Sequence, residues 1–96
     1  MTVSAWIRLL RTEDGGRLTA VRTGYRPTVR FGNTYTESSI DLIGRDVLAP
    51  GEECQAQIVF VNADYVEEFL RPEQTFDITE GTRKVGAGRI LMVGEA

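Results

Sequence analysis

Short stretches of alternating apolar and polar residues recur along this chain. Alternation with a period of two is the pattern of a β-strand that buries one face. The stretches that alternate, or that are rich in β-branched and aromatic residues, are 3–11, 25–31, 35–43, 54–61, 76–79 and 85–93. About six short strands, with turn signals roughly every 8–12 residues, predict an all-β barrel or sandwich.

The alternation also predicts which side chains face the core. In 54–61, the expected central strand, one face holds Cys54, Ala56, Ile58 and Phe60. In 25–31 one face holds Tyr25, Pro27, Val29 and Phe31. Pro27 has no N–H to donate to a neighbouring strand, so we expect it at the start or edge of its strand. The apolar run 90–93 predicts a strand that is covered on both faces.

Glycine and proline mark the turns between these strands. Pro50 and Gly51 fit the two central positions of a type II turn, and Gly15 and Gly16 supply another turn. One segment departs from the pattern, because apolar residues in 64–70 recur at helical spacing and Pro72 ends them. We expect a single helical turn there.

The composition limits the domain size and the kinds of site that the chain can form. A length of 96 residues predicts one domain, 1–96, and the 42% hydrophobic and 26% charged residues are ordinary for a globular chain. One cysteine and no histidine exclude an internal disulfide, a Cys/His nucleophilic pair and the usual zinc sites. Cys54 is expected to be buried and inert. We therefore predict no catalytic residue, no metal and no cofactor.

The sequence gives no sign of export or of membrane insertion. Its first residues lack the basic and apolar segments of a signal peptide. No apolar run approaches the roughly 20 residues that a membrane helix needs. We therefore expect a cytoplasmic protein without a membrane partner.

Charge is spread unevenly along the chain. Residues 1–30 hold six arginines and two acids, a net charge of +4, whereas nine acids and four basic residues from Glu52 onward give −5. A basic face on an acidic protein can contact a phosphate backbone locally, without the overall field of a general nucleic-acid binder. Scattered, solvated charges are the alternative explanation.

Three groups of residues, taken in order, carry a resemblance to a known family. The first is Gly15-Gly16-Arg17, separated by six residues from Gly24-Tyr25-Arg26-Pro27. The second is Ala49-Pro50-Gly51-Glu52, and the third is 76–90, which contains Glu80-Gly81, Arg83 and Val85-Gly86-Ala87-Gly88. In this order and spacing they resemble the third, C-terminal domain of bacterial elongation factor Tu.

The resemblance implies a closed six-stranded antiparallel Greek-key β-barrel without the GTPase domain of that factor. It implies a non-enzymatic, stand-alone binding module whose partner is a protein. That partner could be a protein of translation. It could be a second copy of the chain, which would cover the surfaces that pack on neighbouring domains in the family. Alternatively, the barrel could act as a decoy for a protein that recognises elongation factor Tu.

The alternative is an RNA-binding module. The family contacts the T-stem of tRNA through the loops that correspond here to Gly15, Gly16 and Arg17 and to Glu80 and Gly81. Arg26 and Arg83 complete the candidate partner-binding or RNA-binding residues, although Arg26 could instead pair with an acid such as Glu80. Leu18, Ala20 and Thr82 depart from the family pattern, and acids near 64–68 would repel phosphate. A protein partner is therefore favoured over tRNA.

Overall fold

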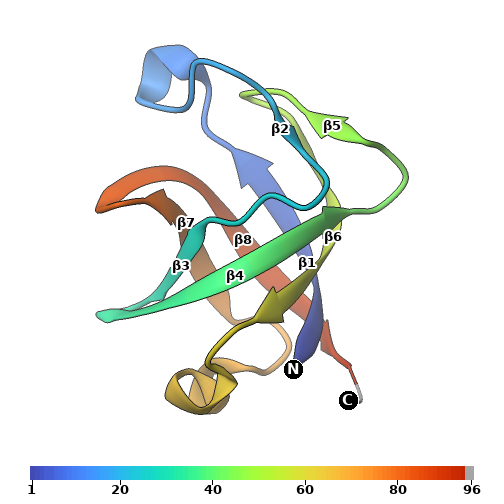
Figure 1. Ribbon diagram of the computed structural model, residues 1–96, viewed down its shortest axis with the longest axis vertical. Coiled ribbons are helices and arrows are strands. Elements are labelled where there is room, and N and C mark those ends of the chain that lie inside the picture. Colours follow the sequence, from blue (N-terminus) through green and yellow to red (C-terminus); the bar gives the residue numbers. More distant parts are fainter. Residues whose placement is uncertain (95–96) are drawn as a thin grey trace.

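The computed structural model describes residues 1–94 and has six antiparallel strands that close into a barrel (Figure 1). Around the barrel their order is β1 (Thr2–Leu9), β6 (Glu53–Phe60), β4 (Thr34–Leu42), β3 (Thr28–Phe31), β7 (Thr75–Glu80) and β8 (Arg83–Val93). β8 pairs with β1 and completes the ring. The predicted all-β class and the closed six-stranded antiparallel barrel are confirmed.

The connections follow a Greek-key path. β3, β4 and β6 are neighbours, and β1 lies beside β6 after a long connection from β1 to β3. That connection contains the 3₁₀ helix η1 (Thr12–Asp14) and β2 (Val21–Arg22), which pairs with β5 (Val47–Leu48) in a small separate ribbon. The sequence did not predict this ribbon, because strands of two residues are too short to show alternation.

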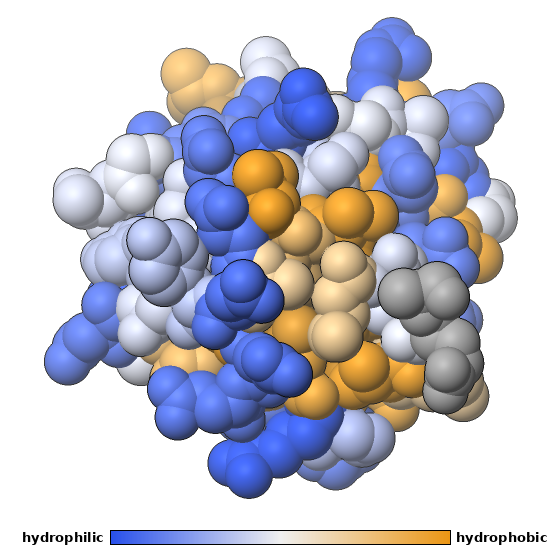
Figure 2. Space-filling model, turned by 60° about the horizontal axis from the view of Figure 1, so that its bottom comes forward, coloured by the Kyte–Doolittle hydropathy of each residue, from blue (hydrophilic) through white to orange (hydrophobic). Residues whose placement is uncertain are grey.

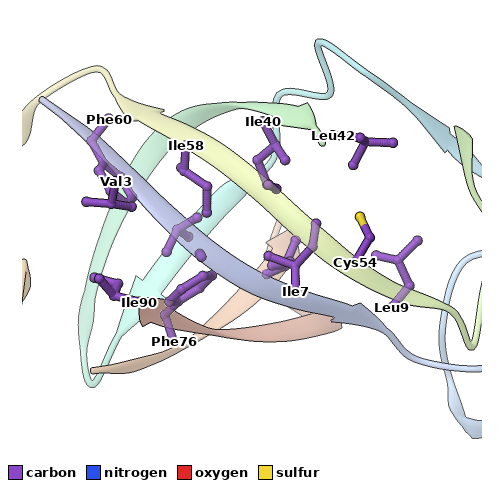
Figure 3. Packing of buried hydrophobic residues seen from close by; sticks show 14 of the residues in the cluster. Val3, Ile7, Leu9, Ile40, Leu42, Cys54, Ile58, Phe60, Phe76 and Ile90 are labelled. Atoms are coloured by element: carbon purple, nitrogen blue, oxygen red, sulfur yellow. The ribbon is translucent and has the colours of Figure 1, made fainter. Parts of the chain in front are cut away.

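The predicted alternation fills the barrel interior. Figure 3 shows side chains from β1, β6, β4, β7 and β8 pointing toward one another, among them Val3, Ile7, Ile58, Phe76 and Ile90. Phe31 lies at the centre of an aromatic cluster, with the rings of Phe60, Phe69 and Phe76 at centroid distances of 5.8, 5.3 and 5.7 Å. Such aromatic pairs add to the stabilisation that comes from burying their area.

The segment after β6 differs from the expected single helical turn. It forms two 3₁₀ helices, η2 (Ala63–Tyr65) and η3 (Glu67–Phe69). Val66 and Leu70 are buried over the end of the barrel, whereas the Tyr65 side chain is 71% exposed. A segment this short makes too few hydrogen bonds to offset the cost of nucleating a longer helix. It therefore forms short 3₁₀ turns, which are positioned by the few apolar side chains that it buries.

The prediction that both faces of 90–93 are covered is wrong. Ile90 is fully buried, but Met92 is 65% exposed. Ser4 pairs with Met92 and Ala5 pairs with Ile90, so Leu91 is the extra residue of a β-bulge. The outer face of β8 has no second layer over it, and the apolar run therefore does not indicate two covered faces.

Two glycines allow β8 to close the barrel. A Cβ at Gly88 would lie 2.4 Å from Phe76 Cζ and 3.0 Å from the Trp6 carbonyl oxygen. A Cβ at Gly86 would lie 2.7 Å from the Arg8 carbonyl oxygen. The glycines are therefore required for space, since side chains there would force β8 away from β1 and from the core.

Gly88→Ala is expected to lower the free energy of unfolding by about 1–3 kcal/mol, the usual cost of overpacking a core. The added methyl collides with the Phe76 ring, so Phe76→Leu in the same chain should recover part of the loss. Urea unfolding of the two single variants and the double variant measures this coupling. A Gly88→Ala variant as stable as the native chain would contradict the close approach.

Candidate functional site

The two loops that the sequence singled out lie together at the barrel end that carries η1 (Figure 1). The Arg83 guanidinium, at the start of β8, donates hydrogen bonds to the carbonyl oxygen of Gly15 at 3.0 and 3.2 Å. It also donates to the carbonyl oxygen of Gly16 at 2.6 Å. Gly81, in the turn between β7 and β8, has a φ of 64°, which favours glycine.

Glu80 joins the same loops through its carboxylate. Arg17 forms an ion pair with Glu80, and the Tyr25 hydroxyl donates to the same Glu80 oxygen, Oε2, at 2.5 Å. The Arg17 guanidinium also lies 5.3 Å from the centroid of the Tyr25 ring and donates to the Thr19 carbonyl oxygen at 3.1 Å. Burial and the hydrogen bond to Glu80 raise the pKa of Tyr25 well above its usual value, so the phenol stays a neutral donor.

We call this set of residues the loop clasp: Gly15, Gly16, Arg17, Tyr25, Glu80 and Arg83. Its arginines are satisfied within the chain, because Arg17 faces a carboxylate and Arg83 faces two backbone carbonyls. The Arg17 side chain is only 23% exposed. The loop clasp therefore holds two loops together. Its guanidinium groups have fewer free hydrogen-bond donors with which to bind a phosphate on another molecule.

The expected pairing of Arg26 with Glu80 is wrong, because Arg17 takes that place. Successive side chains of an extended segment point to opposite sides. Tyr25 turns toward Glu80, so Arg26 points away and is exposed. Arg26 instead lines a separate depression together with Glu37, Ser38 and Val61.

Among residues 1–94, no group of three or more histidine, cysteine or acidic side chains is placed to hold a metal. Cys54 lies on the core face of β6, as expected, and burial raises the pKa of its thiol. A thiol with a raised pKa is a poor nucleophile at neutral pH.

The opposite end of the barrel carries a surface that the sequence analysis missed. Met1, together with the run from Phe60 to Tyr65, lines a groove of about 570 Å³. We call it the apolar groove after its exposed Val61 and Tyr65 side chains, although Asn62 and Asp64 contribute polar groups to the same lining. The side chains of Met1, Val61 and Tyr65 are 43%, 58% and 71% exposed. Figure 2 shows hydrophobic residues gathered on this face, with hydrophilic residues beside them.

A signal for the apolar groove was present in the alternation of 54–61. The outward face of this strand begins with Gln55 and Gln57, but it continues with Val59 and Val61. Both valines are exposed. The change from polar to apolar residues along the outward face of this strand was therefore the sequence signal for this surface.

Six of the seven candidate residues thus lie at the loop clasp or in its hairpin turn, and Arg26 lies apart. No protein-family model matches the chain. Among the described residues, no helix is long and apolar enough to cross a membrane.

Arg83→Lys is expected to lower the free energy of unfolding by about 1–2 kcal/mol, because one ammonium cannot hold both loop carbonyls as the guanidinium does. Exchange of the Gly16 amide hydrogen, which bonds to the Arg11 carbonyl oxygen, should accelerate. Arg89→Lys is the matched control, since the Arg89 side chain pairs only with the exposed Glu73 among the described residues. Equal losses of unfolding free energy in Arg83→Lys and Arg89→Lys would show that the clasp contacts stabilise the fold no more than an exposed ion pair does.

Proposed function

We propose that this chain is a non-enzymatic protein-binding module that holds its partner at the apolar groove. The observation that carries this proposal is the exposure of Val61 and Tyr65 beside a groove lined by Phe60 and Ala63. Single exposed apolar residues are common on protein surfaces, but apolar residues gathered around one concave site are typical of an interaction surface. Binding a partner there would remove this area from water.

The charges around the two ends favour a protein over a nucleic acid. At the loop clasp, Arg17 and Arg83 are engaged within the chain. Near the apolar groove, Asp64, Glu67 and Glu68 are exposed and would repel a phosphate backbone within a Debye length of about 8–10 Å. tRNA binding, the alternative, would have to rely on arginines outside the clasp.

We also propose that the barrel is related to the third domain of elongation factor Tu. The support is that the resembling motifs, far apart in sequence, meet in one place: Arg83 reaches Gly15 and Gly16, and Arg17 reaches Glu80. The partner would then be a protein of translation, or a protein that recognises such a barrel. A cytoplasmic location belongs to the same proposal.

Val61→Asp should abolish partner binding without unfolding the barrel, because this side chain already faces water and surface substitutions usually change stability by about 0.5 kcal/mol or less. Leu18→Asp is the matched control, since Leu18 is 84% exposed and lies in the connection between η1 and β2, directly after Arg17 of the loop clasp. The immobilised native chain and both variants are exposed to lysate of the source cells at low and high salt. Bound proteins and RNA are then identified.

The proposal expects proteins that bind the native chain and Leu18→Asp, that are lost with Val61→Asp, and that resist salt. Bound tRNA that is released steeply by salt and is unaffected by Val61→Asp would contradict it and support the RNA-binding alternative. Ligands that are lost only with Leu18→Asp would also contradict it, because they would bind at the loop clasp end.

A further inference from the structure

We infer that the first half of β4 offers an open sheet edge to an extended peptide of another protein, which binds by adding a strand beside Tyr35 and Glu37. Peptides recognised in this way are held mainly by main-chain hydrogen bonds. The inference goes beyond the proposed function, because it rests on backbone groups of β4 and not on the apolar side chains of the groove.

The strand β4 is longer than its pairing with β6. Its ladder with β3 covers residues 34–37, whereas its ladder with β6 covers 38–42 and ends at the pair Ser38 and Phe60. One further hydrogen bond follows, from the Val61 N–H to the Glu37 carbonyl oxygen at 3.0 Å. The chain then turns away into η2, and Figure 1 shows the tip of the β3–β4 hairpin extending away from the end of β6. One edge of 34–37 is therefore left without a neighbouring strand.

The direction of the hydrogen bonds along β4 shows which backbone groups face this edge. In an antiparallel sheet, the N–H and C=O groups of successive residues point to opposite sides of the strand. The Ser38 N–H donates to the Pro27 carbonyl oxygen on the β3 side, and the Glu37 carbonyl oxygen accepts from Val61 on the β6 side. Tyr35 lies two residues before Glu37, so its N–H and C=O also point away from β3.

Three main-chain groups at this edge are free to bond a partner. Among residues 1–94, no main-chain hydrogen bond reaches the N–H or the C=O of Tyr35 or the N–H of Glu37. Both residues are exposed, so η2, which lies near β4, does not cover them. A strand laid antiparallel to β4, in the line that β6 leaves, would pair with all three groups.

These free groups select a peptide backbone as the occupant. Two are donors and one is an acceptor, and they are spaced along one extended strand, which is the complement of another extended main chain. A phosphate backbone offers acceptors for the two donors but has no amide N–H for the Tyr35 carbonyl oxygen. A second copy of the chain would present the same edge, and its pairing would appear as a dimer.

The side chains of the edge favour one kind of neighbour. Tyr35 is 44% exposed and lies on the outer face of β4. Aromatic side chains pair favourably with aromatic or β-branched side chains directly opposite them. Residues 33–37 contain one charged side chain, Glu37, and neither the lysine nor the proline that often protects an open edge. We therefore expect a β-branched or aromatic residue of the peptide opposite Tyr35.

Hydrogen exchange of the free chain, followed by NMR, tests the edge itself. The Tyr35 and Glu37 amides should exchange at least about tenfold faster than the Ser38 amide, which donates to Pro27 at 3.1 Å. Equal protection of the three amides would overturn the inference, because the edge would then be covered.

Peptide binding is tested with random 12-residue peptides, displayed on phage and selected against the native chain. The most enriched peptide is synthesised, and its affinity is measured by fluorescence anisotropy. Its amide nitrogens are then methylated one at a time. Methylation should weaken binding by about tenfold or more at every second residue of the bound segment, because alternate N–H groups of an added strand face β4.

Two substitutions at one position separate the main chain from the side chain. Tyr35→Pro removes an N–H that points away from β3, which is the position where an edge strand tolerates proline. It should weaken peptide binding by about tenfold. Tyr35→Val is the matched control, since it keeps the N–H and a β-branched side chain, and should bind within about threefold of the native chain. Urea unfolding shows whether both variants keep the native fold.

A peptide whose affinity is indifferent to methylation, or equal for the native chain and a folded Tyr35→Pro, would overturn the inference. The absence of any enriched peptide would do the same. So would a dimer of the native chain that Tyr35→Pro dissociates, because the edge would then serve a second copy. If Tyr35→Pro fails to fold, the methylation series on the native chain decides alone. The proposed function is tested separately, by Val61→Asp at the groove.

Discussion

Closure of β8 against β1 is the constraint on which the rest of the molecule depends. Gly86 and Gly88 let the β8 backbone pass close to Arg8, Trp6 and the Phe76 ring. This pairing joins the first and last strands and encloses the core around Phe31. It also fixes the hairpin turn after β7 beside the loop that carries η1. Without it the barrel would have two open edges, and neither end would keep its shape.

The two ends of the barrel differ in how fully their groups are satisfied. At the loop clasp, charged groups meet partners inside the chain, as Arg17, Tyr25 and Arg83 illustrate. At the apolar groove, the Val61 and Tyr65 side chains are exposed to water. Interaction with another molecule would stabilise the second end more than the first. This contrast is the physical basis for the proposal that a partner binds at the groove.

Alternation predicted the strands well because a strand with one buried face must alternate, as β6 does from Glu53 to Phe60. It also predicted that Cys54 would face the core. Pairing between distant side chains was harder: the sequence analysis considered Arg26 as a partner of Glu80, and the structure has Arg17 there. The choice depends on which way Tyr25 turns in the folded chain. The apolar groove was missed because most of its lining comes from Met1 and from residues 62–65, which follow β6, and the only periodic signal was the exposed Val59 and Val61 at the end of the alternating stretch.

The most direct measurement is site-specific photo-crosslinking in lysate of the source cells. A photoreactive benzoylphenylalanine replaces Tyr65 at the groove or, in a second chain, Leu18 near η1, both of which are highly exposed. Irradiation should give a discrete protein adduct from position 65 and none from position 18. A protein or RNA adduct from position 18, with none from position 65, would place the binding surface at the loop clasp end and contradict this account.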